Sequence, residues 1–192
     1  MDYLRYYIPM LVQIAAYAGF AAGGNGVFVG IASLPLLGLI DSILPNDMGV
    51  RKMKPGFVAD LPVWISTIMA VGLYFMAAHW ISTEPNASGV QIAGAILSCA
   101  WMSVVPLVPA AHELYHQRGK LRRFVGQYSQ VCYLDCTREI AHVTGHHLDV
   151  ATVLDSDTAK RGTSLYVFTP KAVVQSTRDA WRMESDNLEK QG

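Results

Sequence analysis

Three long stretches without a charged residue constrain this chain more than any other feature. Residues 6–40, 61–83 and 85–112 contain no Asp, Glu, Lys or Arg. About 20 helical residues cross the hydrocarbon core of a bilayer, so the first stretch is long enough for two spans and each of the others for one. A glycine-rich turn at residues 23–26 divides the first stretch. The sequence therefore predicts four transmembrane helices, near residues 6–22, 27–44, 61–80 and 89–111.

Charge is distributed unevenly along the 192 residues. Of the 15 basic and 15 acidic side chains, only nine fall in residues 1–112. The chain is 52% hydrophobic and has a formal net charge of zero. The high apolar content excludes a disordered chain, and the absence of a basic excess argues against a nucleic-acid partner. We expect an all-α membrane protein, with a transmembrane region over residues 1–111 and a helical cap over residues 112–192.

The positions of the basic residues predict how the chain lies in the bilayer. Arg51, Lys52 and Lys54 fall between the second and third predicted spans, Arg5 precedes the first, and eleven Lys and Arg follow the fourth. The other two loops have none. Because cytoplasmic loops carry an excess of Lys and Arg, we expect the N-terminus, the middle loop and the cap on the cytoplasmic side.

Within the cap, three segments have a recognisable character. Residues 121–133 mix apolar and basic side chains and suit a helix near the membrane surface. Residues 164–174 predict either a short interfacial element or a buried strand, and residues 177–190 predict a solvated helix.

Five of the six histidines fall into two clusters just beyond the fourth predicted span. His112 and His116 lie four residues apart, and so do His142 and His146, with His147 adjacent. Residues four apart share one face of an α-helix, so each pair can present two imidazoles to one metal ion. Neutral imidazole binds iron, copper, zinc and nickel. We therefore expect a metal centre built from all five, with enough ligands to admit two metal ions.

One motif supports a different chemistry. His112-Glu113-x-x-His116 matches the zinc-peptidase pattern, in which two histidines bind zinc and the glutamate activates water. The extended pattern requires a further histidine where this chain has Arg122, and a peptidase leaves the second histidine cluster unexplained. A non-enzymatic metal-binding membrane protein is a third hypothesis, and an assay of substrate oxidation separates it from the enzymes.

Three segments carry a family resemblance. HELYH at 112–116, IAHVTGHHLDVAT at 140–152 and LDSDTAKRGTSLY at 154–166 resemble the membrane-bound non-haem di-iron hydroxylases, relatives of the histidine-box fatty acid desaturases. Within that group the chain is most similar to the xylene and p-cymene methyl monooxygenase hydroxylases, with the alkane 1-monooxygenases close behind. The resemblance covers nearly the whole chain, and the two histidine boxes are its specific part.

The resemblance implies an enzyme that inserts one oxygen atom of O₂ into a methyl C–H bond of an alkyl-aromatic hydrocarbon or an alkane, giving a primary alcohol. The second oxygen leaves as water, with electrons from an NADH-dependent flavin and iron–sulfur reductase or from rubredoxin. It implies a bacterial inner-membrane protein with two iron ions, and it carries the ligand role onto His112, His116, His142, His146 and His147. No catalytic residue is assigned beyond these ligands. Glu113, inside the first box, is expected to orient a histidine.

Two further expectations follow from the resemblance. Hydrocarbons partition into the bilayer, so a channel between the spans is expected to lead substrate to the iron. Small or flexible residues either border this channel or pack the helices together; they are Gly72, Ala77, Gly94, Ala95 and Met102. Family members also carry a further histidine box, an additional histidine and two more spans, so the resemblance predicts that this chain is the N-terminal half of a longer enzyme.

Overall fold

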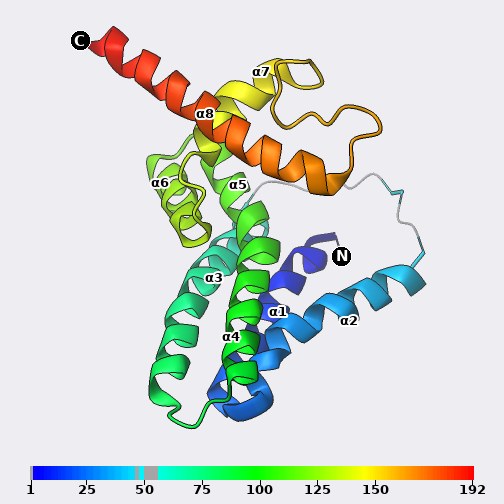
Figure 1. The fold of residues 1–192 in the computed structure, drawn as a ribbon. Helices are drawn as coiled ribbons and strands as arrows, with labels where there is room; N and C mark the ends of the chain where they lie inside the picture. Colours follow the sequence, from blue (N-terminus) through cyan, green and yellow to red (C-terminus); the bar gives the residue numbers. More distant parts are fainter. Residues whose placement is uncertain (1, 46–47, 50–55) are drawn as a thin grey trace.

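The computed structural model describes residues 2–45, 48–49 and 56–192. Within these residues the chain is helical and contains no strand, which confirms the all-α prediction. Helices α1 to α4 lie together, and the polar part of the chain lies beyond one end of them (Figure 1). In order, the elements are η1 (Asp2–Tyr7), α1 (Ile8–Ala22), η2 (Gly24–Phe28), α2 (Val29–Ile43), α3 (Phe57–Thr83), α4 (Gly89–Met102), η3 (Ser103–Leu107), α5 (Val108–His116), α6 (Lys120–Ser129), η4 (Gln130–Tyr133), η5 (Ile140–His146), α7 (His147–Asp149) and α8 (Leu165–Gln191).

Among the described residues, three helical stretches are long and apolar enough to cross a membrane. They are Gly24–Ile43, Phe57–Thr83 and Gly89–His116, and they overlap the second, third and fourth predicted spans. The first predicted span falls mainly on α1, which has 15 residues. A helix of that length rises only about 23 Å, less than the hydrocarbon core of roughly 30 Å. Arg51, Lys52 and Lys54, on which the predicted orientation depends, lie outside the described residues.

The helix of the fourth predicted span does not end at residue 111. Its helix passes through a π-helical turn, η3, and continues as α5 to His116. Pro106 lies inside η3 and has no N–H to donate, so the regular bonding pattern is interrupted there. The elements α4, η3 and α5 therefore form one continuous helical rod, and the first histidine box lies at its end.

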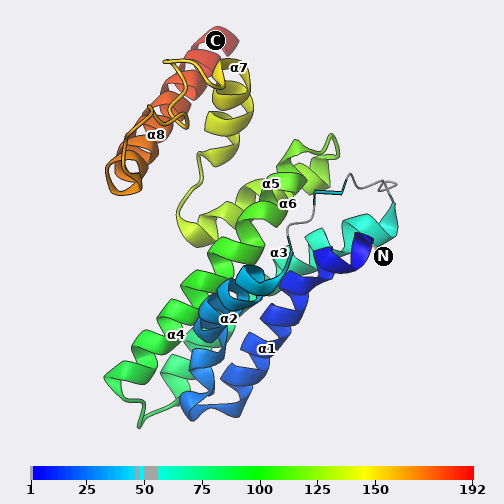
Figure 2. The same ribbon diagram turned by 90° about the vertical axis from the view of Figure 1, so that its right-hand side faces the viewer.

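The helices form two hairpins whose turns lie together at the end of the bundle opposite α8 (Figures 1 and 2). Ser88 begins α4 with a capping box, because its hydroxyl accepts from the Gln91 amide at 3.2 Å and the Gln91 side chain accepts from the Ser88 amide at 2.9 Å. Gln91 Nε2 also donates to Asn25 Oδ1 at 3.3 Å. This last bond joins the two turns.

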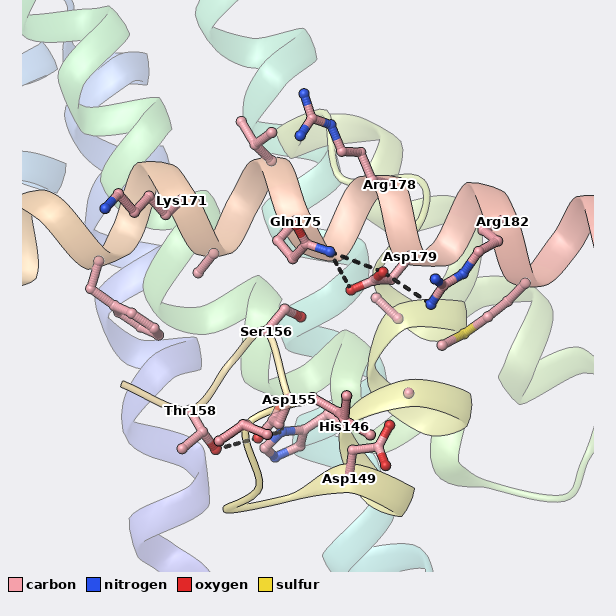
Figure 3. A pocket seen from close by; sticks show the side chains of 18 of the residues that line it. His146, Asp149, Asp155, Ser156, Thr158, Lys171, Gln175, Arg178, Asp179 and Arg182 are labelled. Atoms are coloured by element: carbon pink, nitrogen blue, oxygen red, sulfur yellow. Dashed lines mark hydrogen bonds and ion pairs between the residues drawn. The ribbon is translucent and has the colours of Figure 1, made fainter. Parts of the chain in front are cut away.

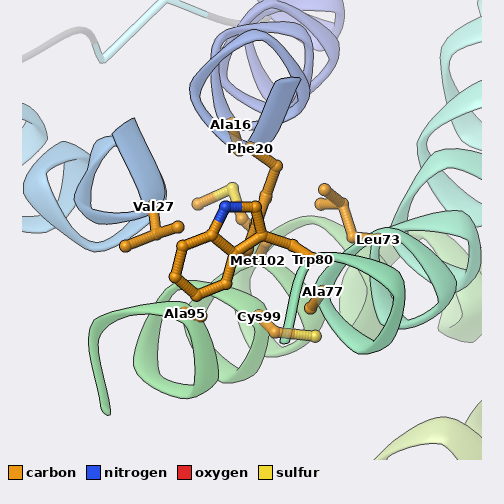
Figure 4. Packing of buried hydrophobic residues seen from close by; sticks show 9 residues of the cluster. All are labelled: Ala16, Phe20, Val27, Leu73, Ala77, Trp80, Ala95, Cys99 and Met102. Atoms are coloured by element: carbon orange, nitrogen blue, oxygen red, sulfur yellow. The ribbon is translucent and has the colours of Figure 1, made fainter. Parts of the chain in front are cut away.

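A compact apolar cluster occupies the interior of the bundle (Figure 4). Trp80 and Phe20 are 5% and 3% exposed, and small side chains fill the space around them. The buried members of the cluster are Ala16, Phe20, Val27, Leu73, Ala77, Trp80, Ala95, Cys99 and Met102. Ala77, Ala95 and Met102, which sequence reasoning left open as channel residues, therefore pack helices together.

Close helix contacts and buried polar bonds hold η2, α2 and α4 in register. A Cβ on Gly94 would clash with the Phe28 ring, so these helices approach only because Gly94 has no side chain. Ser98 of α4 donates to the Val27 carbonyl at 2.6 Å and accepts from the Ile31 amide at 2.9 Å. In an interior without water, such bonds satisfy backbone groups that have few other partners.

Large apolar side chains also cover the outside of the bundle. Leu11, Leu36, Ile68 and Phe75 are 63%, 55%, 62% and 72% exposed. Exposed apolar surface of this extent is normal for helices that face lipid and unusual for a monomeric soluble domain.

The polar part begins where α6 folds back against α5. Gly126 of α6 lies against the backbone of Ala111 and Tyr115, and Arg122 of α6 pairs with Asp60 of α3 at 2.7 Å. Residues 164–174 and 177–190 form one helix, α8, so the buried-strand alternative is wrong. Pro170 is accommodated inside that helix, near its beginning.

Candidate metal centre

Helix α5 sets the position of the first histidine pair. His112 and His116 lie one turn apart at the end of the rod formed by α4, η3 and α5. Their Nε2 atoms are 2.7 Å apart, and the Tyr115 ring stacks on His112 with the ring centroids 5.2 Å apart. Both imidazoles therefore point to one side of α5, as residues four apart in an α-helix do.

The second group of histidines lies along the π-helix η5 and on His147, the residue that follows it. In a π-helix the backbone bonds join residues five apart, so residues i and i+5 come together. His142 and His147 accordingly have their Nε2 atoms 3.0 Å apart. His142 and His146, which lie four residues apart, have stacked rings with centroids 5.1 Å apart.

Four imidazoles from α5, η5 and the first residue of α7 converge. His112, His116 and His142 each offer a ring nitrogen, and these three atoms all lie within 4.8 Å of one another. The rings of His116 and His147 have centroids 4.9 Å apart, which brings the fourth histidine beside the first pair. Two histidine pairs, far apart in sequence, thus face each other across a small space.

The spacing of these nitrogens fits a metal ion. Histidine nitrogens bind a first-row metal at about 2.1 Å, so two ligands at a right angle lie roughly 3 Å apart. The observed separations within the pairs, 2.7 and 3.0 Å, match that value. An all-imidazole set suits iron, zinc, copper or nickel equally by ligand type.

The local electrostatics keep His142 in the form that binds metal. Burial, followed by the nearby imidazoles beginning with His112, lowers the pKa of His142 to about 4. The ring is therefore neutral at pH 7 and retains a lone pair for coordination.

His146 is held by a carboxylate that sequence reasoning missed. Its Nδ1 lies 3.0 Å from both oxygens of Asp155, whose side chain is fully buried (Figure 3). Burial opposes ionisation of Asp155, but hydrogen bonds from Thr158, His146 and the Asp157 amide outweigh it and lower the pKa to about 2. The Asp-x-Asp-Thr sequence is a turn signal. It could not reveal that the turn faces a histidine nine residues earlier.

Three ion pairs hold the two residues that precede η5. Glu139 is buried and bonds Arg123 of α6 at 2.7 Å. Arg138 pairs with Asp135 at 2.7 Å and with Asp157 at 3.3 Å. The Arg123–Glu139 pair links this segment to α6, and the Arg138–Asp157 pair links it to the Asp155 turn.

Glu113 turns to a different set of partners. Its Oε1 accepts from Gln117 Nε2 at 2.6 Å, and Gln117 Oε1 accepts from Arg122 at 3.3 Å. In the described part of the chain its hydrogen-bond partner is thus a glutamine and not a histidine. His79 is exposed near the opposite end of α3, away from the cluster.

A cavity of about 940 Å³ opens beside the histidine-bearing helix. Its wall is largely apolar where α3 and the η3–α5 segment meet, with Val63, Pro106 and Ala110 among the lining residues. Glu113 also lines it, one residue after His112. This largely apolar cavity therefore lies directly beside α5, the helix that carries the first histidine pair.

Apolar helices long enough to cross a bilayer, with a cluster of imidazoles at the end of one of them that could hold a metal ion, are the features of a membrane-protein class with a histidine cluster. The chain is 41% identical to the xylene/toluene monooxygenase hydroxylase component XylM of Pseudomonas putida, over all of this chain and 52% of the relative. It is 32% identical to alkane 1-monooxygenase 2 of Alcanivorax borkumensis, over 99% of this chain and 53% of the relative. It is also 32% identical to alkane 1-monooxygenase 1 of Pseudomonas aeruginosa, over 70% of this chain and 34% of the relative.

The chain belongs to the family of xylene and alkane monooxygenase hydroxylases. It spans about half the length of the curated relatives that it matches over its whole length. No protein-family model matches the chain. These relatives are oxygenases, so the zinc-peptidase alternative is not favoured. Membership in a family of non-haem iron enzymes makes iron the metal implied for the histidine cluster.

Proposed function

We propose that the complete protein hydroxylates a methyl group of an alkyl-aromatic hydrocarbon of the xylene or toluene type. One atom of O₂ enters the C–H bond to give a primary alcohol, and the other leaves as water with two electrons and two protons. The observation that carries the proposal is the convergence of imidazoles from α5 and η5 in a chain so similar to a xylene/toluene hydroxylase component. The higher identity to that relative, 41% against 32% for the alkane enzymes, favours the methyl arene over the alkane.

His112, His116, His142, His146 and His147 are the proposed iron ligands. Bound iron supplies the activation of O₂, which zinc and protein side chains do not supply. Five imidazoles exceed the needs of a single three-histidine site, so we propose two iron ions in the complete enzyme, with further ligands from outside these residues. Because η5 and α5 are joined through α6 and the Arg123–Glu139 pair, the two histidine groups are held together before any metal binds.

We also propose that four segments cross the membrane. Besides the three long apolar helices, the additional spanning segment would be η1 together with α1, which follow one another directly from Asp2 to Ala22. Residues 1–111 would form the transmembrane region and residues 112–192 a cytoplasmic cap, with the N-terminus on the cytoplasmic side of a bacterial inner membrane. In this arrangement the bilayer supplies substrate to the cavity between α3 and α5. The cap then receives electrons from an NADH-dependent flavin and iron–sulfur reductase or from rubredoxin.

The decisive experiment expresses the complete gene product with an NADH-dependent reductase and supplies p-xylene or n-octane under ¹⁸O₂. We expect the labelled benzylic alcohol, dependent on NADH, and less octanol. His142→Ala should abolish the product. Glu113→Gln should retain it, because Glu113 bonds Gln117 and not a ligand. Zinc-dependent proteolysis that Glu113→Gln abolishes, without any oxygenated product, would contradict the proposal.

A further inference from the structure

The second histidine box has two adjacent imidazoles with different partners. His147 has its Nε2 3.0 Å from that of His142, whereas His146 has its Nδ1 3.0 Å from both Asp155 oxygens. The rings of His146 and His147 are nearly perpendicular, at 87°. The side chains of these two neighbouring histidines thus point in different directions, and of the two it is His146 that contacts the Asp155 carboxylate.

Asp155 is set up to accept hydrogen bonds. Its side chain is fully buried, although the loop that carries it is mostly exposed. The Asp157 amide donates to Oδ1 at 2.9 Å, and the Thr158 hydroxyl donates to Oδ2. The Ala151 amide donates to the Thr158 oxygen at 3.1 Å, so that hydroxyl directs its own proton to Asp155. Each carboxylate oxygen therefore already has one donor besides His146.

A carboxylate surrounded by donors fixes the proton on His146. Since an ionised Asp can only accept, His146 must place its hydrogen on Nδ1 to bond it. The lone pair of a neutral imidazole is then on Nε2, on the side of the ring away from Asp155. Nε2 is also the atom through which His112, His116, His142 and His147 approach one another.

We propose that Asp155 is a positioning residue that fixes the tautomer and orientation of His146, so that His146 binds metal through Nε2. The inference rests on the proposed function, because it assigns a role toward the metal of that site. The Arg138–Asp157 pair at 3.3 Å also holds the turn at residues 155–158 against the segment that precedes η5. Carboxylates that orient a ligating histidine in this way typically contribute 10- to 100-fold to metal affinity or activity.

The test uses the complete protein in lipid vesicles and compares Asp155→Ala and Asp155→Asn with a matched control, Ser156→Ala. Ser156 lies in the same turn, and its side chain takes no part in the hydrogen bonds to Asp155 or in the Arg138–Asp157 pair. The Asp155→Asn substitution keeps the size of the side chain and one neutral acceptor, which guards against simple unfolding of the turn. A His146→Gln sample assigns the His146 signals in ¹⁵N-histidine spectra of the metal-free protein.

We expect His146 to carry its proton on Nδ1 in the wild type and in Ser156→Ala, and to lose that preference in Asp155→Ala. The Fe(II) dissociation constant should rise by about 10- to 100-fold in Asp155→Ala and by less in Asp155→Asn. A wild-type His146 protonated on Nε2, or an Asp155→Ala protein that binds Fe(II) as tightly as the control, would overturn the inference while leaving the hydroxylase intact. A wild-type protein that binds no iron would instead overturn the proposed function, and this inference with it.

Discussion

Replacing Gly126 by alanine tests how closely α6 must approach the histidine-bearing helix. A Cβ at this position would lie 2.7 Å from the Tyr115 amide nitrogen and 2.8 Å from the Ala111 carbonyl oxygen. Ordinary contacts of a Cβ begin near 3.4 Å, so α6 would have to retreat by about 0.7 Å. Both obstructing atoms belong to the backbone of α5, and neither can rotate away.

The expected effect has a structural and a catalytic part. Overpacking of this kind costs about 1–3 kcal/mol, and the better helix propensity of alanine offsets up to about 1 kcal/mol of that. Tyr115 stacks on His112, so a displaced α5 also moves a proposed ligand. Misplacement by about 1 Å can lower a rate by a factor of roughly 100, so we expect hydroxylation to fall by about 10- to 100-fold.

The assay measures the thermal unfolding midpoint in detergent, and the rate of alcohol formation in vesicles, for Gly126→Ala and Gly38→Ala. Gly38 also lies inside a helix, but nothing lies within 4 Å of a Cβ built there. Gly38→Ala should match the wild type in the rate of alcohol formation, and its unfolding midpoint should be equal to or higher than that of the wild type because alanine favours the helix. If Gly126→Ala behaved like Gly38→Ala, the close packing of α6 on α5 would be refuted.

Two other substitutions test the bundle and its connection to the cap. Ser98→Ala removes a donor to Val27 and an acceptor for Ile31, so it should destabilise the protein by about 1–3 kcal/mol in detergent unfolding; an unchanged midpoint would contradict that bond pair. Asp60→Asn breaks a pair with Arg122 that is about one-third exposed. A double-mutant cycle with Arg122→Met should give a coupling of about 1 kcal/mol or less, and a much larger value would show that solvent does not screen the pair.

The apolar helices were predictable because their signal is strong and local. Uncharged runs of the length of a bilayer leave few alternatives to a spanning helix, and the structure has helices at each of them. The exact end of the last one was not predictable. It depends on Pro106, which widens the helix into a π-turn without stopping it, and this carries the helix on to His116.

The positions of the histidines in the sequence predicted which of them share a helix, and did not predict how closely each ring approaches its neighbours. Spacing by four residues brings His112 to His116, because α5 is α-helical. His142 lies near both His146, four residues on, and His147, five residues on, because η5 is a π-helix. A π-turn has no reliable sequence signature, so the contact between His142 and His147 could not be predicted from the spacing.

Asp155 could not have been found from spacing alone. It reaches His146 through an irregular loop, in which Ala151 has a positive φ of 65° and Thr158 turns back to bond the Ala151 amide. Loops of this kind follow from many weak local bonds, so a sequence can indicate the turn without indicating what the turn faces.

Imidazoles from α5 and η5 are proposed to hold the same iron. Iron X-ray absorption of the complete protein, compared between the wild type, His112→Ala and His142→Ala, tests whether they do. We predict a wild-type iron shell dominated by imidazole nitrogen, with loss of iron or of imidazole scattering in both variants. An iron shell of oxygen or sulfur ligands, or an iron signal that neither substitution alters, would contradict it.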